Sequence, residues 1–173
     1  GLAELLRCFA AHGLLRIEDA RVRFPGEAQR FYVNGGWLEE HVYDTLRGLR
    51  GELRDVQDLA CSVDIVREGS RGEAVPNEID VACLADNRLY VIECKTRVWG
   101  DGSAAGPGAD ALYRLDSLSD LLGGLQARAM LISYRDLPPH VLRRAADLRI
   151  QVCAGKRLPE LHAVLRAWIV LNG

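Results

Sequence analysis

Residues 76–96, PNEIDVACLADNRLYVIECKT, decide the fold of this chain. Two mainly apolar runs, 79–84 and 89–96, flank the turn-forming residues Asp86-Asn87-Arg88. Runs of this length on either side of such a turn are typical of an antiparallel β-hairpin. The sequence therefore predicts a hairpin whose turn is centred on Asp86 and Asn87.

The hairpin has a charged end. Because strand side chains alternate between faces, we expect Ile79 to share a face with Val81, and Glu78 to share the opposite face with Asp80. The same alternation puts Glu93 and Lys95 on one face of the second strand. A turn at residues 86–87 brings Asp80 close to Glu93. Two carboxylates and a lysine are thus predicted to converge on one face of an otherwise apolar hairpin.

Such a set has a chemical use. Two carboxylates at a fixed separation offer the hard oxygen ligands that Mg²⁺ and Mn²⁺ prefer. A metal held there acidifies a bound water and polarises a phosphoryl oxygen. Lys95, two residues after Glu93, would hold the attacking water or offset charge that develops on the phosphorus centre. A simpler interpretation is a salt-bridged hairpin, in which Glu93 pairs with Lys95 or Arg88.

The elements around the hairpin predict an α/β sheet. A helix is expected over residues 37–49, because Leu38, Val42, Leu46 and Leu49 form one apolar stripe. A strand over 59–67 precedes the hairpin. The remaining expected elements are a helix over 110–122, a strand over 129–134, a helix to about 148, a strand over 149–153 and a helix over 158–171. Strands that alternate with helices in this way indicate a layered α/β architecture.

Residues 1–33 are predicted to be a small N-terminal appendage or linker layer, and residues 34–173 the main domain. The appendage has a helix over 2–12, which ends at Gly13, and a short strand over 30–33. A helix followed by a short hairpin also fits a remnant of a winged helix. Residues 100–108, GDGSAAGPG, are expected to form a loop.

Composition excludes several classes of function. The 173 residues carry 22 Lys and Arg against 24 Asp and Glu, a net charge of −2. A strongly basic nucleic-acid-binding coat is therefore excluded, although a local basic groove is not. No apolar run approaches the roughly 20 residues needed to span a bilayer, and no signal-peptide pattern is present, so a cytoplasmic protein without a membrane partner is expected. The five cysteines form no CxxC pair, which argues against a zinc site.

The charged hairpin behind a helix resembles the PD-(D/E)XK nuclease superfamily. The resemblance runs from about Gly35 to Tyr134, and it implies a restriction-endonuclease-like core of order αβββαβ with C-terminal βα additions. One branch shares a wider set of segments, here GGWLEE at 35–40, NEIDV at 77–81, IECKT at 92–96, LGG at 122–124 and AMLIS at 129–133. In that branch the nuclease domain follows a CARF sensor domain.

That branch implies a metal-dependent endonuclease. Its members are CRISPR-associated antiviral nucleases activated by cyclic oligoadenylate, which cut single-stranded RNA and DNA or nick DNA with Mn²⁺ or Mg²⁺ and work as homodimers. A sensor domain is expected upstream, and these residues do not include one. The chain begins at Gly1 rather than Met, so we expect a fragment of a longer protein.

The resemblance also implies roles for single residues. Asp80 and Glu93 would bind the metal together with the backbone carbonyl of Cys94, and Lys95 would be the catalytic lysine.

The helix of the superfamily contributes a further glutamate, for which Glu39 is favoured over Glu40 because it precedes Val42 and Leu46 by three and seven residues. Glu78 is a weaker candidate metal ligand, with a solvated carboxylate as the alternative.

Two other functions fit the same residues. One is a repair or restriction-type DNA endonuclease without cyclic-nucleotide control. The other is a catalytically inactive nucleic-acid-binding or dimerisation module on the same scaffold. The presence of Asp80, Glu93 and Lys95 together argues against the inactive module, because a scaffold released from catalysis need not retain all three.

Overall fold

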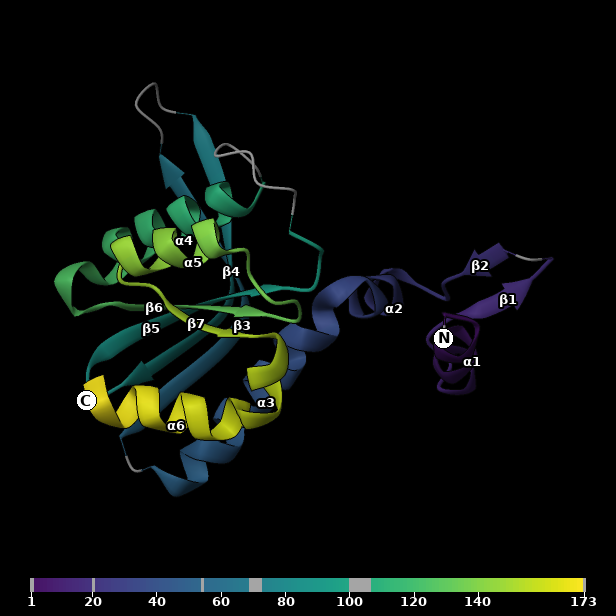
Figure 1. The fold of residues 1–173 in the computed structure, drawn as a ribbon, viewed down its shortest axis with the longest axis horizontal. Helices are drawn as coiled ribbons and strands as arrows, with labels where there is room; N and C mark the ends of the chain where they lie inside the picture. Colours follow the sequence, from purple (N-terminus) through teal and green to yellow (C-terminus); the bar gives the residue numbers. More distant parts are fainter. Residues whose placement is uncertain (1, 20, 54, 69–72, 100–106, 173) are drawn as a thin grey trace. The chain divides into compact units, whose positions relative to one another are not determined.

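The computed structural model of the chain describes residues 2–19, 21–53, 55–68, 73–99 and 107–172 (Figure 1). The chain divides into two compact units, residues 1–37 and residues 38–173. Within the described residues, no helix is both long and apolar enough to cross a membrane.

The first unit is a helix, a two-stranded hairpin and a short helical segment. Its elements are α1 (Leu2–Ala11), β1 (Arg16–Glu18), β2 (Arg21–Arg23), α2 (Glu27–Phe31) and the π-helical turn η1 (Tyr32–Gly36). The predicted strand over 30–33 is wrong, because these residues are helical. Gly35 adopts a φ of 143°, and a side chain at Gly36 would meet the ring of Phe31. The two glycines therefore permit a kinked helix where side chains would not fit.

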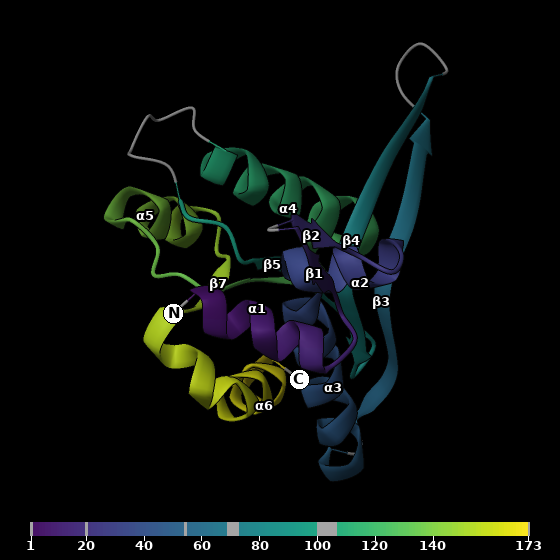
Figure 2. The same cartoon turned by 90° about the vertical axis from the view of Figure 1, so that its right-hand side faces the viewer.

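The second unit is a five-stranded mixed sheet with helices on both faces (Figures 1 and 2). The strands lie in the order β3 (Val56–Glu68), β4 (Ala74–Ala85), β5 (Arg88–Lys95), β6 (Arg128–Ser133) and β7 (Gln151–Ala154). The pairs β3–β4 and β4–β5 are antiparallel, whereas β5–β6 and β6–β7 are parallel. The helical elements are α3 (Trp37–Glu52), α4 (Pro107–Gly123), η2 (Gly124–Gln126), α5 (Pro139–Asp147), η3 (Gly155–Glu160) and α6 (Leu161–Asn172). The order α3-β3-β4-β5-α4-β6 confirms the αβββαβ core, and α5, β7 and α6 are the C-terminal additions.

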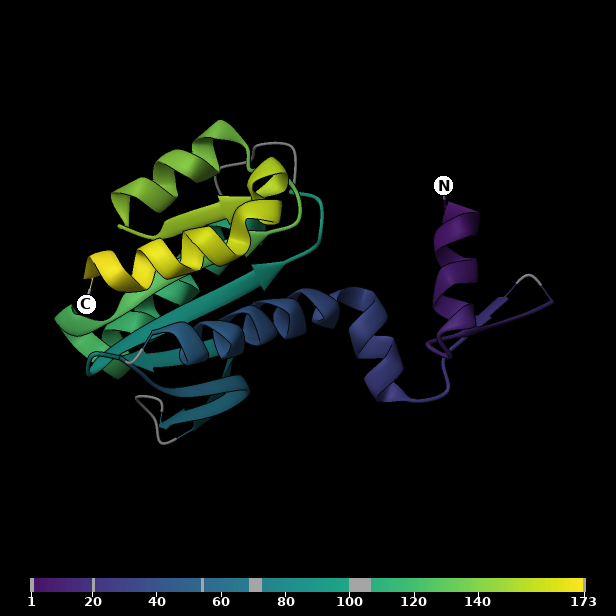
Figure 3. The same cartoon turned by 90° about the horizontal axis from the view of Figure 1, so that it is seen from below.

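Two helices cover each face of the sheet, α4 and α5 on one and α3 and α6 on the other (Figures 1 and 3). The predicted stripe of α3 is fully buried at Leu38, Val42, Leu46 and Leu49. On the same side, the Tyr90 ring meets the Trp168 ring edge-on, with 4.9 Å between the ring centroids. Burying a leucine of this kind contributes about 1.5–3 kcal/mol, so α3 is held firmly on the sheet.

The β4–β5 turn is as tight as its sequence predicts. Ala85 pairs with Arg88, and both intervening residues, Asp86 and Asn87, have positive φ values of 48° and 55°. Two positive φ values in a two-residue turn match the twist of the flanking strands. Gln57 on β3 supports the turn, since its side chain accepts a hydrogen bond from the Asn87 backbone and donates one to the Asn87 side chain. The turn fixes the register, so Val81 pairs with Ile92.

The alternation predicted for the first hairpin strand is interrupted. Ile79 packs in the same cluster as Val91 and Leu115, which lie on the α4 side. Val91 pairs with Ala82, so strict alternation would have placed Ile79 on the opposite face. Cys61 pairs with Val81 and Val63 pairs with Ile79, so Asp80 lies opposite Ser62, which has a positive φ of 48°. The expectation that Ile79 shares a face with Val81 is therefore wrong, because the ribbon changes face beside Asp80.

Candidate active site

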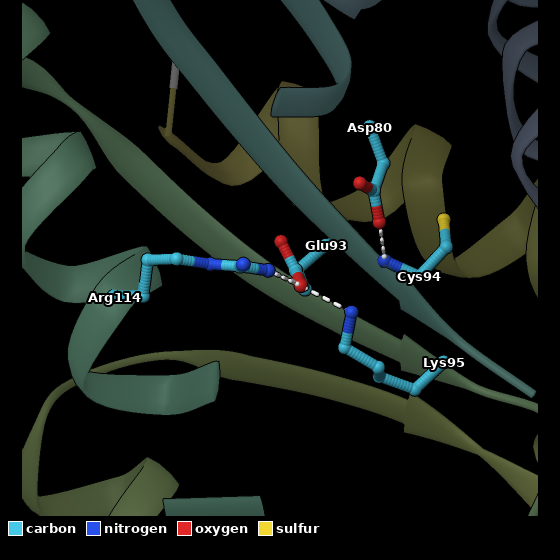
Figure 4. Close-up of polar contacts among 5 residues, drawn as sticks. All are labelled: Asp80, Glu93, Cys94, Lys95 and Arg114. Atoms are coloured by element: carbon cyan, nitrogen blue, oxygen red, sulfur yellow. Dashed lines mark hydrogen bonds and ion pairs between the residues drawn. The ribbon is translucent and has the colours of Figure 1, made fainter. Parts of the chain in front are cut away.

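The site forms where β4 and β5 separate. The last residues paired between these strands are Val81 and Ile92, and Asp80 follows directly. Its carboxylate accepts a hydrogen bond of 2.6 Å from the backbone N–H of Cys94 (Figure 4). A side-chain carboxylate thus takes the place of a backbone acceptor. This bond fixes a carboxylate at the point where the sheet opens, beside the segment Glu93-Cys94-Lys95.

Glu93 is buried and doubly paired. Only 2% of its side chain is exposed, yet one carboxylate oxygen, Oε1, forms ion pairs with both Lys95 Nζ and Arg114 Nη2 (Figure 4). A carboxylate buried without partners would be costly, and cationic partners offset that cost. The salt-bridged pair Glu93–Lys95 of the simpler interpretation is therefore present. It does not exclude the chemical interpretation, because the carboxylate lies beside Asp80 as well.

The backbone of Lys95 is anchored by the neighbouring strand. Lys95 pairs with Ser133 on β6, and its carbonyl accepts a hydrogen bond of 2.8 Å from Tyr134 N–H. Ser133 is fully buried, and its hydroxyl accepts a bond of 2.9 Å from the indole N–H of Trp99 and donates one to the carbonyl of Arg135. These contacts hold the ends of β5 and β6 together, so the backbone of Lys95 has a fixed position.

The carboxyl groups of the site repel one another. The pKa of Asp80 is raised from 3.8 to about 6, mainly by burial and next by the charge of Glu93, against the lowering effects of the Cys94 N–H bond and Lys95. Burial also raises the pKa of Glu39 from 4.5 to about 7, with the carboxyls of Asp80, Glu78 and Glu93 adding to the shift. The raised pKa values mean that the nearby cations do not fully offset burial and repulsion. A cation added to the site would be stabilised.

The structure brings together most of the predicted site residues. Glu39 on α3 is half-buried and interacts electrostatically with Asp80, Glu93 and Lys95. Glu40, the next residue, is exposed. Glu78 is also exposed, although its charge reaches Glu39 and Asp80.

Cys94 contributes no reactive thiol. It is 7% exposed, and burial together with the neighbouring carboxyls raises the pKa of its thiol well above the ordinary value. Its side chain therefore stays protonated at neutral pH, and the role predicted for this residue concerns its backbone carbonyl alone.

Arg114 was not predicted. It lies on α4, between the buried Leu112 and Leu115, and reaches Glu93 from the helix that covers the sheet. One signal was available in the sequence. Arg114 is the single basic residue of α4, which also carries Asp110, Asp116 and Asp120. An arginine next to two inward-facing leucines can pack its stem along the apolar face, which leaves its charged head at the edge of the sheet.

The carboxylates are not grouped as they would be around a metal ion. Across the described ranges, no three or more His, Cys, Asp or Glu side chains are arranged to hold one. Oε1 of Glu93 is instead directed at Lys95 and Arg114.

Comparison with known families matches residues 26–172 to the family described as Card1-like, endonuclease domain. The chain belongs to this Card1-like endonuclease domain family. The family resemblance inferred from the segments around Asp80 and Glu93 is thereby confirmed, and the domain is an endonuclease domain.

Solved structures agree with this assignment. The Card1-like domain is similar to protein VC1899 from Vibrio cholerae, with 37% identity and a TM-score of 0.87 over 99% of this chain and 43% of that one. It is also similar to Can2 from Sulfobacillus thermosulfidooxidans, solved in complex with cyclic tetra-adenylate, with 29% identity and a TM-score of 0.79 over 96% of this chain and 45% of that one. The chain thus spans less than half the length of either protein. A search of curated proteins finds no match.

Proposed function

We propose that this Card1-like domain is a metal-dependent nuclease that hydrolyses phosphodiester bonds at the site formed by Asp80, Glu93 and Lys95. One observation carries the proposal. The buried carboxylate of Glu93 lies beside that of Asp80, which is hydrogen-bonded to the β5 backbone. Lys95, from the same strand as Glu93, forms an ion pair with Glu93. Membership of an endonuclease domain family gives this set of groups its reaction class.

The donor atoms of the site are of the type that Mn²⁺ and Mg²⁺ prefer. Asp80, Glu93 and Glu39 supply hard carboxylate oxygens, and the raised pKa values of Asp80 and Glu39 indicate uncompensated negative charge. Asp80 and Glu93 would hold the ion with the Cys94 carbonyl, and exposed Glu78 is a weaker candidate. When bound, the ion would supply Lewis acidity toward a phosphoryl oxygen and a more acidic water.

The chain's own residues would do the remaining work. Lys95, anchored through β6, carries a positive charge to the place where negative charge develops on the phosphate, an effect that is strongest in a partly dehydrated site. Glu39 adds a third carboxyl from α3, suited to holding a water by hydrogen bonds. Glu93 keeps Lys95 oriented toward the site through their ion pair.

We also propose that the domain cuts single-stranded RNA or DNA, or nicks DNA, and that it serves CRISPR antiviral defence under the control of cyclic oligoadenylate. Support comes from the likeness to Can2, whose structure contains cyclic tetra-adenylate. The activator would bind a CARF sensor domain joined to this one, and the working form would be a homodimer. Because the chain spans 45% of Can2, this control belongs to the longer protein.

The test is cleavage of labelled single-stranded RNA, single-stranded DNA and supercoiled plasmid in Mn²⁺, Mg²⁺ or EDTA. Glu93→Ala and Lys95→Ala are expected to abolish cutting that depends on metal. Lys156→Ala is the matched control, because Lys95 and Lys156 are the two lysines of the chain and Lys156 is exposed. The longer protein is assayed in parallel with cyclic tetra-adenylate. Full cutting by a folded Glu93→Ala variant would place the reaction elsewhere.

A further inference from the structure

The Glu93 carboxylate binds two cations of different character. Lys95 belongs to β5 itself, and its side chain is 30% exposed. Arg114 comes from α4, and its side chain is 47% exposed. Both contact the same oxygen, Oε1, of a residue that is almost completely buried. Figure 4 shows the guanidinium group of Arg114 directed at the Glu93 carboxylate, on the side away from Cys94.

This one carboxylate oxygen already contacts two positive charges, those of Lys95 and Arg114. A divalent ion at the Asp80 and Glu93 carboxylates would add two positive charges within a few ångströms of the guanidinium group. Charges of like sign at such distances repel strongly in a partly buried site. This repulsion favours displacement of one of the two resident cations from the Glu93 carboxylate.

Arg114 is the cation able to move. The backbone of Lys95 is held by the bond from Tyr134 N–H, and its side chain is the less exposed of the two. The guanidinium group of Arg114 lies at the end of a long side chain that extends from α4. A released guanidinium would meet the phosphates of a bound nucleic acid, whose oxygens match its fork of N–H donors.

We propose that Arg114 is an exchangeable counter-ion: it occupies the Glu93 carboxylate while no metal is bound and transfers to a phosphate of the nucleic acid when metal takes its place. The inference rests on the proposed nuclease function and deepens it, since it makes Arg114 a positioning residue that couples metal binding to substrate binding. A permanent structural ion pair would behave differently, because its removal would disorder Glu93 and weaken metal binding.

The first measurement is the affinity for Mn²⁺ without nucleic acid, by isothermal titration calorimetry. Removing a competing positive charge at Arg114→Gln is expected to tighten Mn²⁺ binding by about 3- to 10-fold. Arg47→Gln is the control, since it removes the same charge from an exposed surface pair with Asp44 and should leave the affinity unchanged. Unchanged or weaker Mn²⁺ binding by a folded Arg114→Gln variant would overturn the inference.

The second measurement is the affinity for a labelled single-stranded oligonucleotide, by fluorescence anisotropy with Ca²⁺ in place of Mn²⁺. Loss of a charged phosphate contact is expected to weaken binding by about 10-fold in Arg114→Gln. Arg114→Lys should keep the wild-type Mn²⁺ affinity, because its charge remains, and bind the oligonucleotide with intermediate strength. If Arg114→Gln does not fold, Arg114→Lys decides, and oligonucleotide binding as tight as that of the wild type would then overturn the inference.

The two proposals fail in different ways. Wild-type protein that is folded and binds no Mn²⁺ would remove the proposed nuclease function, and the inference with it. Wild-type protein that binds Mn²⁺ and cuts nucleic acid, with an Arg114→Gln variant of unchanged Mn²⁺ affinity, would leave the nuclease function in place and remove the exchange alone.

Discussion

The Asp80 carboxylate accepts the hydrogen bond of the Cys94 backbone N–H at 2.6 Å, one residue beyond the last pair of β4 and β5. This single contact serves two purposes. It satisfies a buried backbone donor at the point where the strands part, and it fixes a negatively charged group beside Glu93. Structure and chemistry therefore depend on different properties of the same side chain.

Substitutions of Asp80 should separate these two properties. Asp80→Asn keeps an oxygen that accepts the Cys94 bond, so it is expected to fold with nearly wild-type stability and to lose cleavage. Asp80→Ala leaves the buried N–H without an acceptor and is expected to cost about 1–3 kcal/mol. Urea denaturation in EDTA measures the stabilities of the two variants, and the nuclease assay measures their cleavage. Equal stabilities of the two variants would show that the bond contributes little.

The stability of the metal-free protein is expected to fall as the pH rises from about 5 to 7.5. Burial and mutual repulsion raise the pKa values of Asp80 and Glu39 to about 6 and about 7. Between the ordinary and the raised values, the folded state binds more protons than the unfolded state, so raising the pH favours unfolding. Denaturation in EDTA across this range checks the sign.

The matched variants for the pH experiment are Glu39→Gln and Glu40→Gln. Glu39→Gln removes the group with the higher pKa and should flatten the slope above pH 6. Glu40 is exposed on the same helix, so its replacement should leave the slope as it is. A stability that instead rises with pH in EDTA would contradict the repulsion described for this site.

Lys95 and Arg114 should show strong coupling in a double-mutant cycle. Each single change to Met leaves Glu93 one cationic partner and is expected to destabilise the fold modestly. The double variant leaves a carboxylate that is 2% exposed without a partner, which costs about 3–5 kcal/mol for a broken buried pair. Denaturation at pH 8 gives the four free energies, and additive losses would mean that Glu93 finds other partners.

The thiol of Cys94 should be dispensable. Because the thiol is buried and its pKa is raised, Cys94→Ala is expected to retain cleavage, since only the backbone carbonyl is assigned a role. In the native protein, a thiol reagent at pH 8 should modify exposed Cys8 and Cys61 and spare Cys94. Mass spectrometry after partial labelling identifies the sites. Rapid labelling of Cys94 would show that the site opens readily.

The sequence predicts local features of this domain well. The turn at Asp86 and Asn87 and the apolar stripe of α3 depend on residues that are close together in the sequence. The register that places Asp80 near Glu93 follows from the turn. The pairing of Glu93 with Arg114 could not be predicted with the same certainty, since it depends on how α4 lies on the sheet after a long connection.

Two features overrode the expected pattern. The change of face beside Asp80 lies opposite Ser62, which adopts a positive φ that serine seldom takes. The segment predicted as a strand over 30–33 is helical and runs into the kinked turn at Gly35 and Gly36. In both places backbone conformation decides the structure, and apolar spacing carries no signal of it.

The irregularity at Ser62 has a consequence for the behaviour of the protein in solution. β3 is the outer strand of the sheet and runs for 13 residues, with Val66 70% exposed. A long regular edge of this kind offers unpaired backbone groups on which other chains can add as strands. Two irregularities lie along this edge, the register shift between Val56 and Asp58 and the positive φ at Ser62. Irregularities of this kind are expected to lower the tendency of the edge to pair with strands of other chains.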